Sequence, residues 1–152
     1  MKTIEEEIKQ KKFPNIFVKT DVNLLFTTGI LQNEMCRFFK KYGITLQQYN
    51  VLRILRGQHP NAVMLSQISE RMIDRMSNAT RLVEKLKQKG LVTREQNPDS
   101  RRQLDIRITE KGLDLLKLID GHMHNQIPVW HYANVTEEEL ELLNVLLDKL
   151  RG

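Results

Sequence analysis

Apolar residues recur every three or four positions through most of the chain, which is the spacing of a helix with one buried face. One such row runs through residues 21–42. Gly43 follows it, and glycine is typical just after the end of a helix. The apolar positions of this predicted helix are Leu24, Leu31, Met35, Phe38 and Tyr42. The preceding residues, 1–19, are polar and charged, so they are predicted to form an arm ahead of the first long helix.

The next helix is predicted from its start signal. Thr45 and Gln48 have the spacing of a capping box, in which each side chain binds the backbone N–H of the other residue. The buried face of this helix is expected to carry Leu52 and Leu55. Residues 57–61 contain glycine, histidine and proline, and are predicted to form a loop.

Two short helices are predicted after this loop. Leu65, Ile68 and Met72 indicate a helix of about two turns. Asp74 is a candidate N-cap for a second helix, which ends at Gly90. The inward positions of the second helix are Ala79, Leu82, Val83 and Leu86. Two short helices joined by a tight turn predict a helix-turn-helix.

A hairpin with a basic tip is predicted next. Residues 91–95 and 104–108 have the composition of strands, and the turn at 96–102 contains Asn, Pro, Asp and Ser. Thr109 can then cap a further helix that ends or bends near Pro128. The apolar positions of that helix are Leu113, Leu116, Ile119 and Met123.

The last predicted helix opens at Thr136, which forms a capping box with Glu139. It carries more apolar residues than one buried face needs, so we expect one face to pack on its own chain and the other on a second copy. The alternative is a helix enclosed entirely by its own fold. Its apolar residues are Leu140, Leu142, Leu143, Val145, Leu146, Leu147 and Leu150.

A length of 152 residues fits a single domain, and 40% hydrophobic with 28% charged residues is typical of a globular protein. The sequence contains neither a membrane-spanning apolar run nor the apolar centre of a signal peptide, so a cytoplasmic protein is expected. The single cysteine, Cys36, cannot form an internal disulfide.

The chain has a formal net charge of +5, and its charged residues are distributed unevenly along the sequence. Residues 75–102 contain eight basic and three acidic residues, whereas residues 113–152 contain three basic and seven acidic ones. A basic middle segment indicates a site for a polyanion, although a solvated charged surface would look the same.

Two blocks of sequence, in the order just described, resemble the MarR family of regulators. The first comprises LSQISERM at 65–72 and TRLVEKLKQKGLV at 80–92; the second comprises NPDSRR at 97–102 and IRITEKG at 106–112. The resemblance covers roughly residues 21–151. It implies a mainly α fold with a small β-hairpin wing, in which 45–112 form a winged helix-turn-helix and 1–44 with 113–152 form a helical dimerisation region. Residues 1–152 would then be a single domain.

The resemblance makes the helix predicted from Arg75 to Lys89 the DNA-recognition helix. With its apolar residues turned inward, the polar side is left for DNA. Arg81 and Asn78 are our candidates for reading bases, because Arg can pair with guanine and Asn with adenine through two hydrogen bonds. Ser77 and Thr80 are expected to hold phosphates. The candidate DNA-binding residues on this helix are Arg75, Ser77, Asn78, Thr80, Arg81 and Lys85.

The family places an arginine of its wing in the minor groove, and both Arg101 and Arg102 qualify. Alignment on Thr109 favours Arg102, but Asp99 then lies one residue earlier than the family's usual aspartate. Ile73 also departs from the family, which often has glycine in this turn.

No effector is evident, although the resemblance allows a small-molecule effector. We expect Cys36 to be a buried, inert thiol. His122, His124 and His131 lack the spacing of a metal site. Trp130 and Tyr132 are expected at the dimer interface, although they also suit a pocket for an aromatic ligand.

The function predicted is a sequence-specific transcriptional regulator that binds a pseudo-palindromic duplex DNA operator as a homodimer. The alternative is a winged-helix module that binds protein, but on the recognition helix only Met76 offers an exposed apolar anchor. No catalytic or metal-binding motif is present, so neither enzyme activity nor a cofactor is expected.

Overall fold

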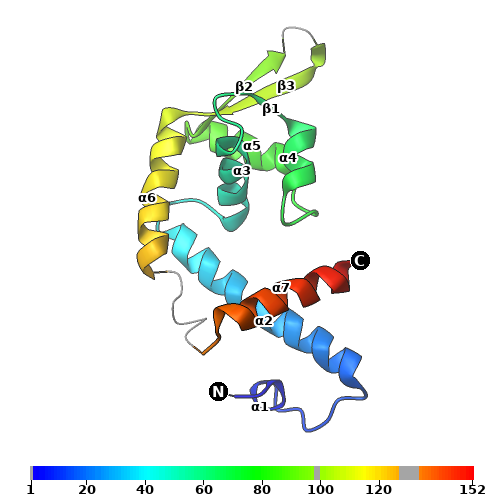
Figure 1. The fold of residues 1–152 in the computed structure, drawn as a ribbon. Helices are drawn as coiled ribbons and strands as arrows, with labels where there is room; N and C mark the ends of the chain where they lie inside the picture. The colour runs from blue at the N-terminus through cyan, green and yellow to red at the C-terminus, as the bar shows by residue number, and fades with distance from the viewer. Residues whose placement is uncertain (1, 98–99, 127–133) are drawn as a thin grey trace.

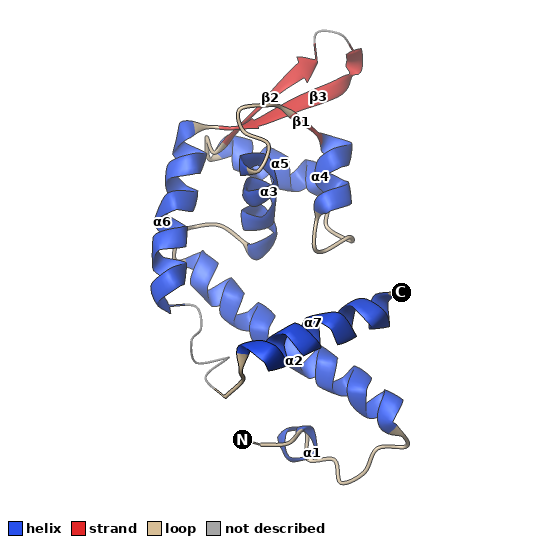
Figure 2. Cartoon of the chain, viewed as in Figure 1, coloured by secondary structure: helices blue, strands red, loops and turns tan. Residues whose placement is uncertain are grey.

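The computed structural model describes residues 2–97, 100–126 and 134–152, and shows a mainly helical chain with one small sheet (Figures 1 and 2). The mainly α class with a β-hairpin is therefore confirmed. The described elements are α1 (Ile4–Glu7), α2 (Ile16–Lys40), α3 (Leu46–Arg56), β1 (Val63–Met64), α4 (Leu65–Arg71), α5 (Ala79–Gln88), β2 (Val92–Asn97), β3 (Ser100–Ile108), α6 (Glu110–Gln126) and α7 (Glu137–Arg151).

The core lies where α3, α4, α5 and α6 meet the sheet and the C-terminal end of α2. Its fully buried side chains include Phe39 of α2, Leu52 of α3, Ile68 of α4, Leu86 of α5 and Leu116 of α6. Each apolar row that the sequence predicted for α3 to α6 contributes to this one cluster. Figure 1 shows α2 running out of the core, with the sheet at the opposite end of the molecule.

The sheet is antiparallel, with the strand order β1-β3-β2. Strand β1 pairs Val63 with Ile106 of β3 and was not predicted. Strand β3 begins at Ser100 instead of 104, so the hairpin is longer than the sequence indicated. The register shifts at its tip, because Gln96 faces Leu104 whereas Asn97 faces Ser100.

The helix starts follow the predicted capping at Thr45 and Thr136, where both capping boxes are formed. Thr109 precedes α6, and its hydroxyl accepts a hydrogen bond from the Gly112 N–H at 3.2 Å. Gly43 and Gly90 follow helices at φ +69° and +71°, a conformation that glycine adopts without strain.

The N-terminal prediction needs two corrections. The polar arm contains α1, and α2 begins at Ile16 because Asn15 caps it through a 3.0 Å bond to the Val18 N–H. Cys36 is exposed on α2, which contradicts the expectation of a buried thiol. The reason is that Cys36 does not belong to the apolar row: it follows Met35, which packs against the core, and so lies 100° further around the helix, on the solvent side.

Helix α7 has no buried residue in the single chain, so the alternative of a helix enclosed entirely by its own fold is wrong. Leu140 and Leu147 are half-buried. A broader apolar face stays open to solvent, and its residues are Leu142, Leu143, Val145, Leu146 and Leu150. No helix in the described part of the chain is both long enough and apolar enough to cross a membrane.

Candidate nucleic-acid interface

Helix α5 and the hairpin place one polar, largely basic surface at the end of the molecule. The α5 residues Ala79, Val83 and Leu86 are buried and Leu82 is half-buried, as predicted. A helix turns 100° per residue, so its opposite side must carry the exposed Thr80, Arg81 and Lys85. This polar side suits a partner that offers phosphates and base edges.

The turn before α5 differs from the prediction. Asp74 does not cap the helix; its carboxylate accepts bonds from the Met76 N–H at 3.0 Å and from the Ser77 hydroxyl at 2.8 Å. Both bonds lie within the turn, so Arg75 and Ser77 precede the helix instead of lying on it.

Asn78 is the N-cap of α5, and its side-chain oxygen accepts a hydrogen bond from the Arg81 N–H at 3.0 Å. A two-point contact with adenine needs that same oxygen, which has a second lone pair and would then accept from the base as well as from the Arg81 N–H. The amide nitrogen of Asn78 still lines the face as a donor.

The cations on this surface are accessible to an anion. Arg75, Arg81 and Lys85 are exposed, and within the described part of the chain none of them forms an ion pair. Two apolar residues accompany them in the turn, Ile73 at 85% exposure and Met76 at 93%. Only Met76 was predicted to be an exposed anchor; Ile73 is a second one.

The hairpin brings the wing arginines to the same end of the molecule. Gln96 pairs in register with Leu104, and the next residue, Asn97, pairs with Ser100. Residues 101–103 of β3 are therefore not matched by any residue of β2, and the backbone of Arg101 and Arg102 lies in a bulge. Their side chains, together with Pro98 and Asp99, lie outside what the structure describes. The structure therefore does not test which arginine points outward.

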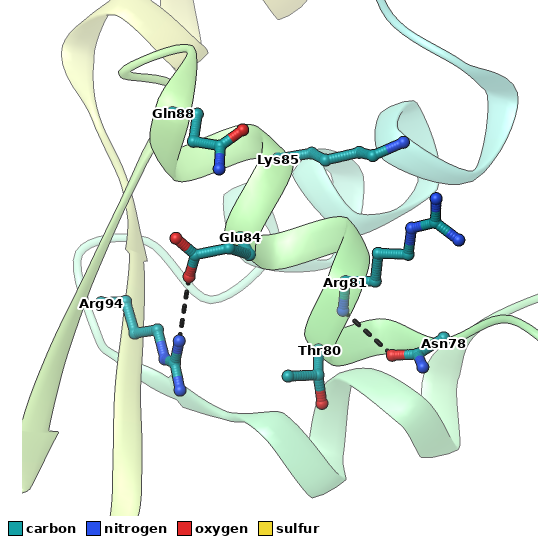
Figure 3. Close-up of a pocket in the computed structure, with 7 residues that line it drawn as sticks. All are labelled: Asn78, Thr80, Arg81, Glu84, Lys85, Gln88 and Arg94. Atoms are coloured by element: carbon teal, nitrogen blue, oxygen red, sulfur yellow. Dashed lines mark hydrogen bonds and ion pairs between the residues drawn. The ribbon is translucent and has the colours of Figure 1, made fainter.

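A surface pocket joins α5 to the hairpin and includes residues that the sequence analysis missed. Figure 3 shows its seven lining residues: Asn78, Thr80, Arg81, Glu84, Lys85, Gln88 and Arg94. Arg94 of β2 donates from Nη1 to Glu84 Oε2 at 3.0 Å. The spacing of Thr80, Glu84 and Gln88 along one side of α5 was visible in the sequence, but the approach of Arg94 depends on how the hairpin packs.

The candidate effector residues stay mostly untested. Trp130, His131 and Tyr132 lie outside the described residues, as does the side chain of His124. His122 Nδ1 lies 2.5 Å from the Tyr42 hydroxyl, joining α6 to the end of α2. Among the described residues, no group of histidine, cysteine or carboxylate side chains is arranged to hold a metal ion.

Comparison with known proteins agrees with this geometry. The sequence profile of the MarR family matches residues 44–104. The chain is 30% identical over 122 residues to the HTH-type transcriptional regulator MhqR of Bacillus subtilis, which covers 79% of this chain and 81% of that protein.

Solved structures of similar proteins agree as well. A MarR transcription factor from Planctomyces limnophilus superposes with a TM-score of 0.67 at 29% identity, covering 90% of this chain and 98% of that one. A mutant of MarR from Escherichia coli in complex with operator DNA shares the fold, with a TM-score of 0.73 at 19% identity and coverage of 86% and 92%.

Proposed function

This chain belongs to the MarR family of transcriptional regulators, and we propose that it binds duplex DNA as a homodimer at a pseudo-palindromic operator. The observation that carries the proposal is the exposed, polar side of α5 beside a basic hairpin. In a dimer, the two copies of α5 would enter successive major grooves, and the two hairpins would lie in the flanking minor grooves.

The residue roles follow from the geometry. Arg81, exposed and without an ion pair in the described chain, is proposed to read guanine through two hydrogen bonds. Asn78, Ser77 and Thr80 supply polar contacts at the start of α5, mainly to phosphates. The cations proposed to attract the DNA backbone are Arg75, Lys85, Arg101 and Arg102.

The proposed dimer contact is formed by α2 and α7, which extend beyond the core. The apolar face of α7 is not covered by any described part of the chain, and α2 exposes Ile16, Phe17 and Leu25 in the same part of the fold (Figure 1). A second copy covers both in the most common symmetric arrangement. We accordingly assign residues 45–112 to DNA binding and 1–44 with 113–152 to dimerisation, within one domain of 1–152.

The proposed place of action is the bacterial cytoplasm, where the operator DNA is. No catalytic activity is assigned, since the relatives named above are transcriptional regulators. A small-molecule effector would act by binding two arrangements of the dimer unequally and so changing the separation of the two α5 helices. Binding a protein partner is the weaker alternative, because Ile73 and Met76 are the apolar exceptions on an otherwise polar surface.

Substitution of Arg81 by Ala tests the proposal at one residue. Losing a two-point base contact should cost about 1–3 kcal/mol of discrimination at one base pair and relax the preference there. Lys87→Ala is the matched control, because Lys87 is an exposed cation of the same helix that does not line the pocket. Sequence selection from random duplexes measures both variants. If Arg81→Ala selects the same sequences as the parent, the assignment of Arg81 is wrong.

A further inference from the structure

The pocket between α5 and the hairpin contains an acidic side chain that the proposed function does not explain. Glu84 lies on the surface assigned to DNA, where a lone carboxylate would repel phosphates. Its side chain is 42% exposed and pairs with Arg94, whose side chain is 29% exposed. We call the seven lining residues named above, which include this pair, the helix–wing pocket.

The polar side of α5 is divided into two rows. Arg81 and Lys85 are four residues apart and form one row; Thr80, Glu84 and Gln88 have the same spacing and form the other. Figure 3 shows Glu84 pointing toward Arg94, whereas Arg81 and Lys85 point away from this pair. The second row therefore faces the hairpin, and the first is left for the bases.

DNA geometry indicates what occupies the space next to the second row. If α5 lies in a major groove and the hairpin in the adjacent minor groove, the sugar-phosphate strand that separates the grooves must cross the junction of α5 and β2. The helix–wing pocket lies at that junction. We propose that it binds a backbone phosphodiester, with Arg94 as the donor and Glu84 as a positioning residue. This inference rests on the proposed function.

The donor chemistry fits this assignment. A guanidinium has five N–H donors in a fixed planar fork, and the Glu84 contact uses Nη1. Figure 3 shows the other terminal nitrogen of Arg94 pointing away from Glu84, so that it can donate to a phosphate oxygen. The Thr80 hydroxyl and the Gln88 amide line the same pocket and add neutral donors.

The pair also explains why a carboxylate is tolerated on this surface. Arg94 neutralises Glu84, and Glu84 holds the long Arg94 side chain against α5, so that less conformational entropy is lost when a phosphate binds. The competing role for Glu84 is acceptance of a hydrogen bond from the amino group of cytosine. That role predicts a changed base preference when Glu84 is replaced, whereas positioning does not.

Arg94→Gln is the primary test, with Arg107→Gln as the matched control. Neighbouring residues of a strand point to opposite faces, and Arg94 faces α5 and pairs in register with the buried Ile106. Arg107 follows Ile106, so it lies on the other face of the sheet, where it contacts Glu95 and Asp105. Both variants remove one positive charge from the hairpin, but only Arg94→Gln removes the guanidinium that pairs with Glu84 in the helix–wing pocket.

The probe is the duplex that the parent protein enriches from a random pool, and the measurement is affinity against salt concentration. Each lost phosphate contact should lower the magnitude of the slope of log K against log salt by about 0.9, or by about 1.8 for a dimer. Affinity should fall about tenfold for each contact, with the enriched sequence unchanged. If Arg94→Gln changes the slope no more than Arg107→Gln, the pocket does not bind a phosphate.

Glu84→Ala tests the positioning role through the sign of its effect. Removal of a negative charge alone would strengthen binding to DNA, whereas loss of a positioning residue should weaken it several-fold. In the Arg94→Gln background the same substitution should strengthen binding, because only the repulsion is then removed. Stronger binding of the single variant, or loss of a preference for cytosine at one position, overturns the positioning role.

Failure of this inference is distinguishable from failure of the proposed function. If the parent enriches no sequence, the proposed function fails. If the parent enriches a sequence that Arg94→Gln binds with an unchanged slope, only the assignment of the helix–wing pocket fails.

Discussion

The open apolar face of α7 predicts that one substitution will separate the proposed dimer. Leu142, Leu146 and Leu150 follow one another at four-residue spacing and remain 58%, 47% and 63% exposed. Complete burial of a leucine side chain is worth about 1.5–3 kcal/mol, so each has about 1 kcal/mol left to gain when a partner covers it. A two-fold axis doubles this amount, because both chains contribute the same face.

Leu146→Glu should remove this gain and place a carboxylate in the contact. An uncompensated polar group costs at least about 1–3 kcal/mol on burial, and it occurs once in each chain. The two effects together amount to at least about 4 kcal/mol per dimer, or roughly a thousandfold in the dimer Kd. The helix itself should survive, since Leu146 is half exposed and makes no part of the buried core.

Sedimentation equilibrium over a range of concentrations measures this loss, with circular dichroism to confirm that the helices remain. Asn144→Glu is the control, because Asn144 lies two residues away, about 160° around the helix, and is also exposed. If Leu146→Glu associates as tightly as Asn144→Glu, the open face of α7 is not the dimer contact and the reasoning is refuted.

Two further predictions concern the glycines of α6 and the tip of the hairpin. A Cβ added at Gly112 would lie 2.4 Å from the Leu91 carbonyl oxygen, so Gly112→Ala should lower the melting temperature. A Cβ added at Gly121 meets nothing within 4 Å, so Gly121→Ala should stabilise the helix by up to about 1 kcal/mol. Equal melting temperatures for the two variants would contradict this packing. Arg102→Ala should weaken binding to all duplexes and reduce its salt dependence while leaving the enriched sequence intact; an altered sequence would instead make Arg102 a base reader.

Features set by local interactions could be predicted from the sequence. The capping boxes at Thr45 and Thr136 depend on two residues three positions apart, and both are formed. The apolar rows of α3 to α6 follow from helical periodicity alone. The prediction that Asp74 caps α5 was wrong because Asp and Asn both favour helix caps and turns. In the structure Asp74 closes a turn, and Asn78 caps the helix.

Features that depend on distant contacts could not be predicted. Strand β1 is two residues long and exists through its pairing with Ile106, so it has no periodicity of its own. The Arg94–Glu84 pair requires the hairpin to fold back on α5. Cys36 is a different case, because it lies outside the apolar row of α2 and its exposure follows from helical periodicity; the expectation of burial rested on the usual behaviour of cysteine alone.

The central claim, a dimer that recognises a specific duplex, is tested most directly by selecting bound sequences from random duplex DNA at near-physiological salt. Sedimentation of the complex with the enriched duplex then counts the protein chains. The account predicts a palindromic sequence bound by two chains. Weak, salt-sensitive binding with no enriched sequence, or an enriched site bound by a single chain, would contradict it.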